Sequence, residues 1–219
     1  MKQIIPFLKQ LAKNNHKEWF DLHRDEYKII RKNYYSFVDE LIEKLSKFDN
    51  SIAGLTAKDV VFRINRDIRF SNNKNPYKTN FGAYICPNGK KSGYGGYYLH
   101  IEPKMCMFAT GVYMTEPAYL NSIREDILAK GKDFVLTIKK AKGFSLDEDD
   151  VLKNVPKGFP KDTEYADYLK MKNICLVKFF DEKMLDNSDE LMKFCVDEFK
   201  KTIDFNKFLN RAIDFLKNS

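Results

Sequence analysis

The sequence predicts an α+β fold in which helices surround a mostly antiparallel sheet of about four to five strands. Short apolar runs with strand-like alternation follow one another within residues 58–113, which favours neighbouring strands joined by hairpins. Apolar residues recur at threes and fours in residues 1–50 and 117–219, as they do in amphipathic helices. No proline-, glycine- or serine-rich linker divides the chain, so we expect residues 1–219 to form one globular domain.

The amino-terminal part is expected to hold one short helix and one long helix. A short amphipathic helix is predicted over residues 4–12, and a long one over residues 17–47. His16 and His23 lie on either side of Trp19, but neither has a partner histidine at the four-residue step of a helical metal site. We therefore interpret both histidines as surface or capping residues.

Residues 62–82 combine basic side chains with turn-forming residues and are the most distinctive part of the sequence. Apolar and polar residues alternate over residues 60–70, which predicts a strand with one buried face. Residues 71–76 are almost entirely turn formers, and residues 81–86 form a second apolar run. We therefore expect a hairpin that gathers three arginines and two lysines in a small volume, with Asp67 as the only carboxylate among them.

The charge of this hairpin predicts an anion-binding site. Like charges held close together repel each other unless an anion or carboxylates lie among them. Arginine side chains also bind phosphate and carboxylate groups through two parallel hydrogen bonds. We therefore predict that the hairpin binds, or takes part in processing, a small ligand that carries phosphate or carboxylate. The expected ligand-binding residues are Arg63, Arg66, Arg69, Lys74, Tyr77 and Lys78.

Two residues are candidates for proton transfer, although the sequence leaves open whether the protein is an enzyme. Asp67 is the carboxylate of the hairpin, and His100 lies in a strand expected over residues 97–102. Alternation in that strand places Tyr98, His100 and Glu102 on one face. If the strand pairs beside the hairpin, the imidazole shares a face with the basic cluster, and histidine is the side chain that titrates near neutral pH. A histidine held by structural hydrogen bonds is the alternative, and we expect neither a metal nor a cofactor.

The same hairpin also fits a nucleic-acid-binding module, which is a second hypothesis. The net charge of +7 and the pI near 9.0 are compatible with a polyanionic partner. In that case exposed Tyr94, Tyr97 or Tyr98 would provide a stacking surface beside the basic cluster. The lysines are spread over several segments and no known nucleic-acid module is recognisable, so this hypothesis ranks second.

A third hypothesis gives the arginines a structural role without any ligand. They would then pair with helix carboxylates such as Glu18, Asp21 or Asp25. Under this hypothesis, substitution of Arg66 would lower the stability of the protein and would leave ligand binding unaffected.

The remaining elements follow from the same periodicities. The glycine-rich residues 87–96 lack the spacing of a phosphate-binding loop, so we interpret them as a flexible connector. The acidic residues 145–150 are interpreted as a solvated turn. Strands are expected over 97–102, 105–113 and 174–180, and helices over 117–130, 134–141, 163–170 and, as a pair, 188–217.

Composition predicts a soluble cytoplasmic protein that does not associate with membranes. No apolar run approaches the ~20 residues of a membrane span, and the amino terminus lacks the apolar core of a signal peptide. The four cysteines lie in apolar runs without the short spacings of zinc or disulfide motifs. We therefore expect Cys86, Cys106, Cys175 and Cys195 to be buried free thiols in a reducing compartment.

Five motifs spread along the chain are shared with a known family. They are the opening FLKQLAKNNHKEWFDLHRDEY, the hairpin RINRDIRFSNNKNPYKTNFG, the strand GYYLHIEP, the turn ATGVY and the later PKGF. Over nearly its whole length the chain resembles a widespread bacterial and fungal family catalogued as domain of unknown function 2461. The hairpin residues that match the family signature are Arg63, Arg66, Asp67, Arg69, Phe70, Ser71, Lys74, Pro76, Tyr77, Lys78 and Thr79.

The resemblance implies where the site lies but implies no particular activity. Where Asn73 and Asn80 stand, the family pattern often carries an aspartate and a histidine. A role that needs either of those side chains is therefore not expected in this chain.

Overall fold

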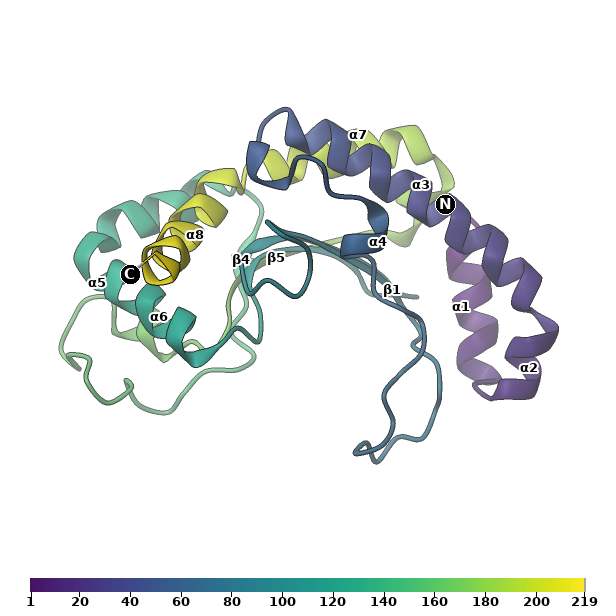
Figure 1. The fold of residues 1–219 in the computed structure, drawn as a ribbon, viewed down its shortest axis with the longest axis horizontal. Helices are drawn as coiled ribbons and strands as arrows, with labels where there is room; N and C mark the ends of the chain where they lie inside the picture. The colour runs from purple at the N-terminus through teal and green to yellow at the C-terminus, as the bar shows by residue number, and fades with distance from the viewer. Residues whose placement is uncertain (219) are drawn as a thin grey trace.

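The computed structural model describes residues 1–218 and contains a five-stranded sheet with helices packed around it (Figure 1). The strands are β1 (Phe81–Ile85), β2 (Gly96–Ile101), β3 (Cys106–Val112), β4 (Ser145–Leu146) and β5 (Ile174–Phe180). Their order across the sheet is β1-β2-β3-β5-β4, and every neighbouring pair is antiparallel. The predicted α+β class and its antiparallel sheet are confirmed.

The helices lie on one side of the sheet and at one end of it. Figure 1 shows α3 and α7 together over the sheet, with α5, α6 and α8 grouped at the end of the sheet where β1 and β3 end and β2 and β5 begin. Within residues 1–218, no helix combines the length and the apolar character that a membrane span requires. The helices are α1 (Ile4–Lys13), α2 (Lys17–Leu22), α3 (Arg24–Ser46), α4 (Ala57–Val60), α5 (Pro117–Lys140), α6 (Ala166–Lys170), α7 (Ser188–Lys200) and α8 (Ile203–Lys217).

The single helix expected over residues 17–47 is wrong, because the chain turns at His23 between α2 and α3. The His23 ring stacks on Trp19 with 3.9 Å between ring centroids, and its Nδ1 donates to the Trp19 carbonyl oxygen at 2.8 Å. This side-chain hydrogen bond satisfies a carbonyl at the end of α2. At the other end of α2, His16 Nδ1 accepts from the Trp19 amide at 3.4 Å, so the capping interpretation of the histidines is confirmed.

Two differences concern the carboxyl-terminal half. The helices expected over residues 117–130 and 134–141 are one element, α5, with a kink at Lys130 where the backbone is not helical. The acidic stretch interpreted as a solvated turn begins with the short strand β4, which pairs Ser145 with Val177 of β5. A two-residue edge strand leaves too little periodicity in the sequence to be predicted.

Two hydrophobic cores stabilise the fold. The first lies between the sheet and helices α1, α3 and α7, and alternate residues of β2 (Tyr97, Leu99 and Ile101) are each 1% exposed or less within it. The second lies among α5, α8 and the neighbouring end of the sheet, and includes Phe134 and Phe205. The four cysteines are buried and free, as expected. Because β2 buries one parity in the first core, its other parity faces away from α3 and α7.

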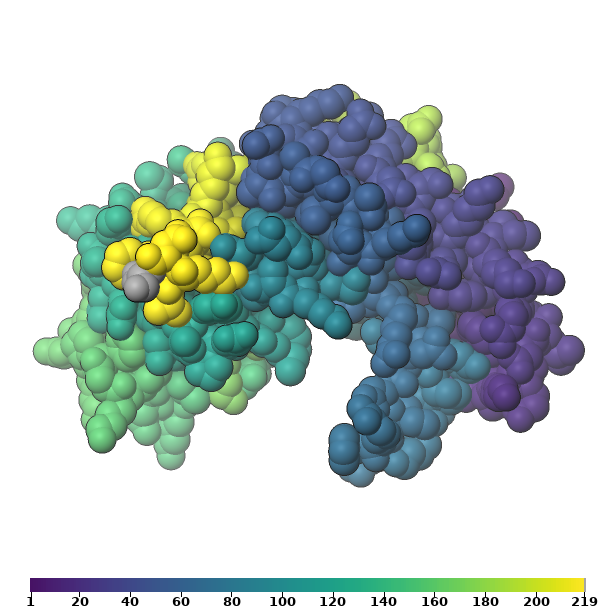
Figure 2. Space-filling view, viewed as in Figure 1, coloured from purple at the N-terminus to yellow at the C-terminus, as the bar shows by residue number. Residues whose placement is uncertain are grey.

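The strand expected over residues 60–70 is wrong. Helix α4 begins at a capping box formed by Thr56 and Asp59, and beyond it the chain makes only isolated bridges from Val61 to Ala83 and from Asn65 to Tyr77. The alternation does not bury one face, because Phe62 is 39% exposed and Phe70 is 94% exposed. Residues 62–80 instead form an irregular projection of two neighbouring segments that extends away from the sheet (Figure 1) and stands out from the rest of the molecule in the space-filling view (Figure 2). We call it the basic arm.

Candidate anion-binding site

The tip of the basic arm satisfies its own cationic groups. The Arg66 guanidinium donates to the Asn75 carbonyl oxygen at 3.0 Å and to the Ser71 hydroxyl at 3.3 Å. Lys74 donates to the Ile68 carbonyl oxygen at 3.2 Å. These contacts fold the turn of the arm, so two of the predicted ligand-binding side chains have a structural role at its tip.

Asp67 and Arg69 form an exposed ion pair on the arm. Arg69 donates through Nε to Asp67 Oδ1 at 3.0 Å and through a terminal nitrogen to Oδ2 at 2.7 Å. These hydrogen bonds lower the pKa of the Asp67 carboxyl. Within residues 1–218, no hydrogen bond or ion pair joins Asp67 to His100. The two candidates for proton transfer are therefore not brought together.

The helix carboxylates that the structural hypothesis assigned to the arm have other partners. In the described part of the chain, none of them pairs with an arginine of the arm, so that expected pairing is wrong. The observed partners are His16 for Glu18, Arg24 for Asp21, and Lys28 for Asp25.

The base of the basic arm forms one wall of a pocket of about 880 Å³. Helices α2 and α3 form the other wall, and the loop between β1 and β2 contributes as well. A volume of this order suits a small-molecule ligand, for which pockets of about 300–1,000 Å³ are usual. Among the described residues that line it, none is acidic, and six are cationic: Arg24, Arg31, Arg63, Lys78, Lys90 and Lys91.

Three of these cations are held by neighbours within the protein. The partners are the Asp21 carboxylate for Arg24, the Tyr35 hydroxyl at 3.1 Å for Arg31, and the backbone carbonyl oxygens of Lys58 and Asp59 at 3.2 and 2.9 Å for Lys90. Of these three, only Arg24 therefore has a carboxylate partner. The partners of Arg31 and Lys90 are uncharged and do not neutralise their charges.

The other three cations of the pocket have no such partner. The side chains of Arg63, Lys78 and Lys91 make no hydrogen bond or ion pair within residues 1–218. The Lys78 ammonium lies over the Phe62 ring, 5.1 Å from its centroid. Burial lowers the pKa of Lys78, and the nearby charge of Arg63 lowers it further. The pocket therefore concentrates positive charge that carboxylates of the protein do not neutralise, and we call it the cationic pocket.

Tyr77 lines the same pocket but is held in the core. It is 6% exposed, and its ring stacks on Phe20 with 4.0 Å between centroids. The Asn15 side chain makes two hydrogen bonds with the Tyr77 backbone, accepting from its amide at 3.1 Å and donating to its carbonyl at 3.0 Å. Tyr77 thus fixes the base of the arm against the amino-terminal helices.

A series of hydrogen bonds runs along β2 on the face turned away from α3 and α7. His100 Nε2 lies 3.0 Å from Glu102 Oε2, and His100 Nδ1 lies 2.9 Å from the Tyr98 hydroxyl. Thr79 donates to the other Glu102 oxygen at 2.9 Å, and the Asn80 amide lies 3.3 Å from His100 Nδ1. An ionised carboxylate can only accept, so Nε2 carries the proton and Nδ1 accepts from Tyr98. His100 and Glu102, predicted to share a face, are therefore in direct contact.

The Tyr98 hydroxyl lies at one end of this series of hydrogen bonds, beyond the His100 imidazole. Burial, followed by the charge of Glu102, raises the pKa of Tyr98 to about 12, so the hydroxyl keeps its proton at neutral pH. A Cβ on Gly82 would lie 2.7 Å from this hydroxyl oxygen, so glycine at this position leaves room for it. The Tyr98 and Phe62 rings meet edge to face at 6.3 Å, which links this series of hydrogen bonds to the lining of the pocket.

The stacking surface of the nucleic-acid hypothesis does not form as expected. Tyr97 is 1% exposed and its hydroxyl donates to Asp49 at 2.7 Å. Tyr94 is 9% exposed and donates to Asp214, also at 2.7 Å. The expected exposure is therefore wrong for both residues, and only Tyr98 is half-exposed.

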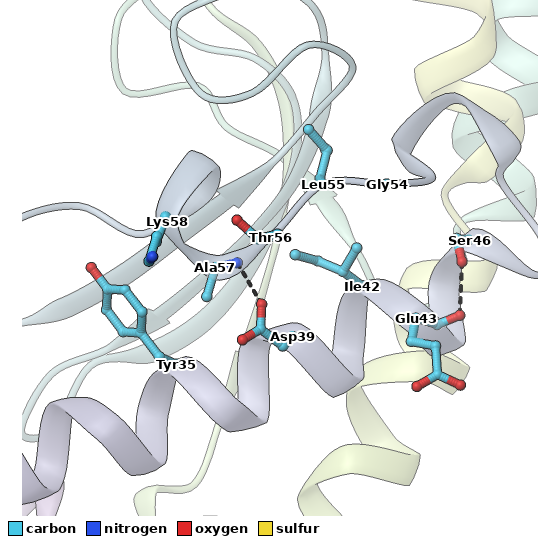
Figure 3. Close-up of a pocket in the computed structure, with 10 residues that line it drawn as sticks. All are labelled: Tyr35, Asp39, Ile42, Glu43, Ser46, Gly54, Leu55, Thr56, Ala57 and Lys58. Carbon is cyan, nitrogen blue, oxygen red and sulfur yellow. Dashed lines mark hydrogen bonds between the residues drawn. The ribbon is translucent and has the colours of Figure 1, made fainter.

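A second cavity, of about 600 Å³, lies along the same helix α3 and shares Tyr35 with the cationic pocket (Figure 3). Asp39 and Glu43 line it, with Lys58 as the one lysine or arginine among its described lining residues. Asp39 accepts from the Ala57 amide at 2.6 Å and so fixes the start of α4. The two cavities therefore differ in the charge of their linings, and the carboxylates of this one would repel an anion.

Four of the six pocket cations are absent from the sequence prediction. Arg24, Tyr27, Arg31 and Tyr35 lie on one face of α3 at steps of three, four and four residues, and this spacing is a signal that the sequence carries. Lys90 and Lys91 lie in the stretch interpreted as a flexible connector. Nothing in the local sequence indicates where that loop packs. Within residues 1–218, no cluster of three His, Cys, Asp or Glu side chains is placed to hold a metal ion.

Comparison with known proteins gives one match. No curated protein and no solved structure is similar enough to count as a match. A family described as conserved hypothetical protein, DUF2461, matches residues 3–208, which include the basic arm, the cationic pocket and the hydrogen-bonded Tyr98, His100 and Glu102. Because the match covers most of the sequence, the chain belongs to the conserved hypothetical protein family DUF2461.

Proposed function

We propose that the protein binds a small anionic ligand, carrying phosphate or carboxylate, in the pocket between α3 and the base of the basic arm. The observation that supports this proposal is the lining of the pocket, with six cationic side chains and no carboxylate. Arg63 and Lys78 belong to the predicted hairpin set and lie in this pocket, whereas Arg66, Arg69 and Lys74 are held within the arm. The proposed site is therefore the base of the arm and not its tip.

An anion between Arg63 and Lys78 would remove an unfavourable interaction. Two like charges in a partly buried site repel each other more strongly than they do in water. The lowered pKa of Lys78 reflects its burial and this repulsion. A bound phosphate or carboxylate would accept hydrogen bonds from both groups and would raise that pKa again.

Binding can be measured by thermal unfolding in the presence of phosphate, tripolyphosphate and carboxylic acids. A ligand present at about 100 times its Kd stabilises the native state by about 2.7 kcal/mol, which corresponds to a rise in Tm of roughly 5–10 °C for a chain of this size. We expect this rise for the parent protein, and we expect Arg63→Ala and Lys78→Ala to abolish most of it, because both side chains line the pocket.

Lys74→Ala is the matched control, since it removes one lysine from the same arm but outside the pocket. It should keep the rise in Tm. If Lys74→Ala removes the rise as fully as Lys78→Ala does, the ligand binds at the tip of the arm. If only oligonucleotides raise Tm, and high salt abolishes the effect, the nucleic-acid hypothesis replaces this proposal.

A further inference from the structure

We infer that the anionic ligand is a nucleoside polyphosphate, an inference that rests on the proposed function and narrows it to one class of ligand. Three properties of the pocket lead to it: the number of cations, the aromatic rings among them, and the limited length of the cationic lining.

The cations exceed what a single phosphate group would neutralise. A phosphate monoester carries a charge of about −1.5 to −2 at neutral pH. Arg63, Lys78 and Lys91 have no acceptor within residues 1–218, and Arg31 and Lys90 have only uncharged acceptors. A chain of two or three phosphates carries more negative charge than one phosphate group and so neutralises more of these five cations.

Each wall of the pocket also presents an aromatic ring with a cation on its face. On α3, the Arg31 guanidinium lies 4.7 Å from the centroid of the half-buried Tyr35 ring. On the arm, the Lys78 ammonium lies 5.1 Å from the centroid of Phe62, which is 39% exposed. Nucleobases stack on aromatic rings and on guanidinium planes. A ligand made of phosphates alone has no ring that could stack on Tyr35 or Phe62.

The pocket is elongated along α3. Arg24, Tyr27, Arg31 and Tyr35 follow one another on one face of the helix, and the eleven residue steps from the first to the last span roughly 16 Å at 1.5 Å per step. An extended ligand, with a planar group at one position and charged groups at others, fits such a lining better than a compact ion does.

The cationic lining ends at Tyr35, and this favours a nucleotide over a nucleic acid. Beyond Tyr35, the next cavity along α3 is lined by Asp39 and Glu43. A phosphodiester backbone continuing past Tyr35 would meet these carboxylates. At the other side, the tip of the arm uses its own cations internally, through Arg66 and the Arg69–Asp67 pair.

Isothermal titration calorimetry of the full-length protein tests this inference with four probes: adenosine triphosphate, tripolyphosphate, adenosine and a short oligonucleotide. We expect adenosine triphosphate to bind roughly tenfold or more tightly than tripolyphosphate, because stacking of one base adds about that factor. Tyr35→Leu and Phe62→Leu should each reduce the affinity for adenosine triphosphate toward that of tripolyphosphate. Both variants should lose more affinity for adenosine triphosphate than for tripolyphosphate, because only the nucleotide carries a ring that stacks.

The matched control is Phe70→Leu, because Arg69 lies over the Phe70 ring at 5.8 Å in the same kind of pair but at the tip of the arm. This variant should bind adenosine triphosphate as the parent does. Tyr35 and Phe62 lie on different elements, so if one leucine variant fails to fold, the other still tests the inference.

The outcomes separate this inference from the proposed function. If tripolyphosphate binds as tightly as adenosine triphosphate and both ring variants are without effect, the ligand is an anion without a stacked ring, and the proposed function stands. If neither adenosine triphosphate nor tripolyphosphate binds, the inference is overturned, and the proposed function then stands only if a carboxylic acid raises Tm. If the oligonucleotide binds more tightly than adenosine triphosphate, the ligand is nucleic acid and the inference is overturned.

Discussion

Replacement of Gly111 by alanine is expected to lower the free energy of unfolding by about 2–6 kcal/mol, or to prevent folding altogether. Gly111 lies in β3 with φ +115°, a conformation that side chains rarely adopt and that carries a strain of about 1–3 kcal/mol. An added Cβ would also lie 2.1 Å from the Ile174 carbonyl oxygen of the paired strand β5. Backbone atoms of a central strand cannot move aside easily, so overpacking adds about 1–3 kcal/mol more. Urea unfolding followed by circular dichroism measures the loss.

Gly158→Ala separates the two contributions to this effect. Gly158 also has a positive φ, +96°, but nothing lies within 4 Å of the position of its Cβ. This control should therefore show the backbone strain without the overpacking. Equal losses for the two variants would mean that β3 and β5 do not approach each other as closely at Gly111 as described.

The second large effect is expected at Glu198, where Glu198→Gln should lower the free energy of unfolding by about 2–3 kcal/mol near neutral pH. Glu198 of α7 is 5% exposed and pairs with Lys178 of β5 and with Lys201, each at 2.8 Å. Burial alone would raise the pKa of Glu198, but its interactions with the two ammonium groups outweigh burial and lower it. The glutamine variant leaves Lys178 and Lys201 without their counter-charge.

The sign of the pH dependence follows from this lowered pKa. A carboxyl with a lower pKa in the folded state contributes stability above its unfolded pKa, about 4.3, and loses it as the pH falls through the folded value. The parent and Glu198→Gln should therefore differ most near neutral pH and converge in acid, as measured by urea midpoints across that range. Glu190→Gln, an exposed residue of the same helix, should stay within about 0.5 kcal/mol of the parent at every pH. A difference at Glu198 that persists unchanged in acid would contradict the electrostatic explanation.

The parts of the fold that the sequence predicts are those with clear periodicity. Tyr97, Leu99 and Ile101 alternate with polar residues and are buried in the first core, so β2 is found within one residue of its expected start. The arm lacks this support: Phe62 and Phe70 alternate correctly but stay exposed, because the arm extends beyond the sheet and no core reaches them. The break at His23 depends on one side-chain hydrogen bond to Trp19, which periodicity does not reveal.

The candidate site shows the same division. The sequence identifies Arg63 and Lys78, because basic residues concentrated in a short hairpin indicate an anion site. It does not distinguish them from Arg66 and Lys74, whose contacts depend on how the turn at the tip folds back on itself. Arg31 of α3 reaches the pocket through tertiary packing between segments about 30 residues apart in sequence, and spacing alone does not show which helix face meets the arm.

The strand order β1-β2-β3-β5-β4 has a consequence for how the chain assembles. Strands β1, β2 and β3 are close in sequence and can pair early, whereas β5 must join β3 across residues 113–173, which contain α5 and α6. Until β5 arrives, the apolar strand β3 is an open edge whose amide and carbonyl groups can pair with another molecule. Folding at high concentration, or synthesis that pauses before β5, therefore exposes this chain to edge-to-edge aggregation at β3.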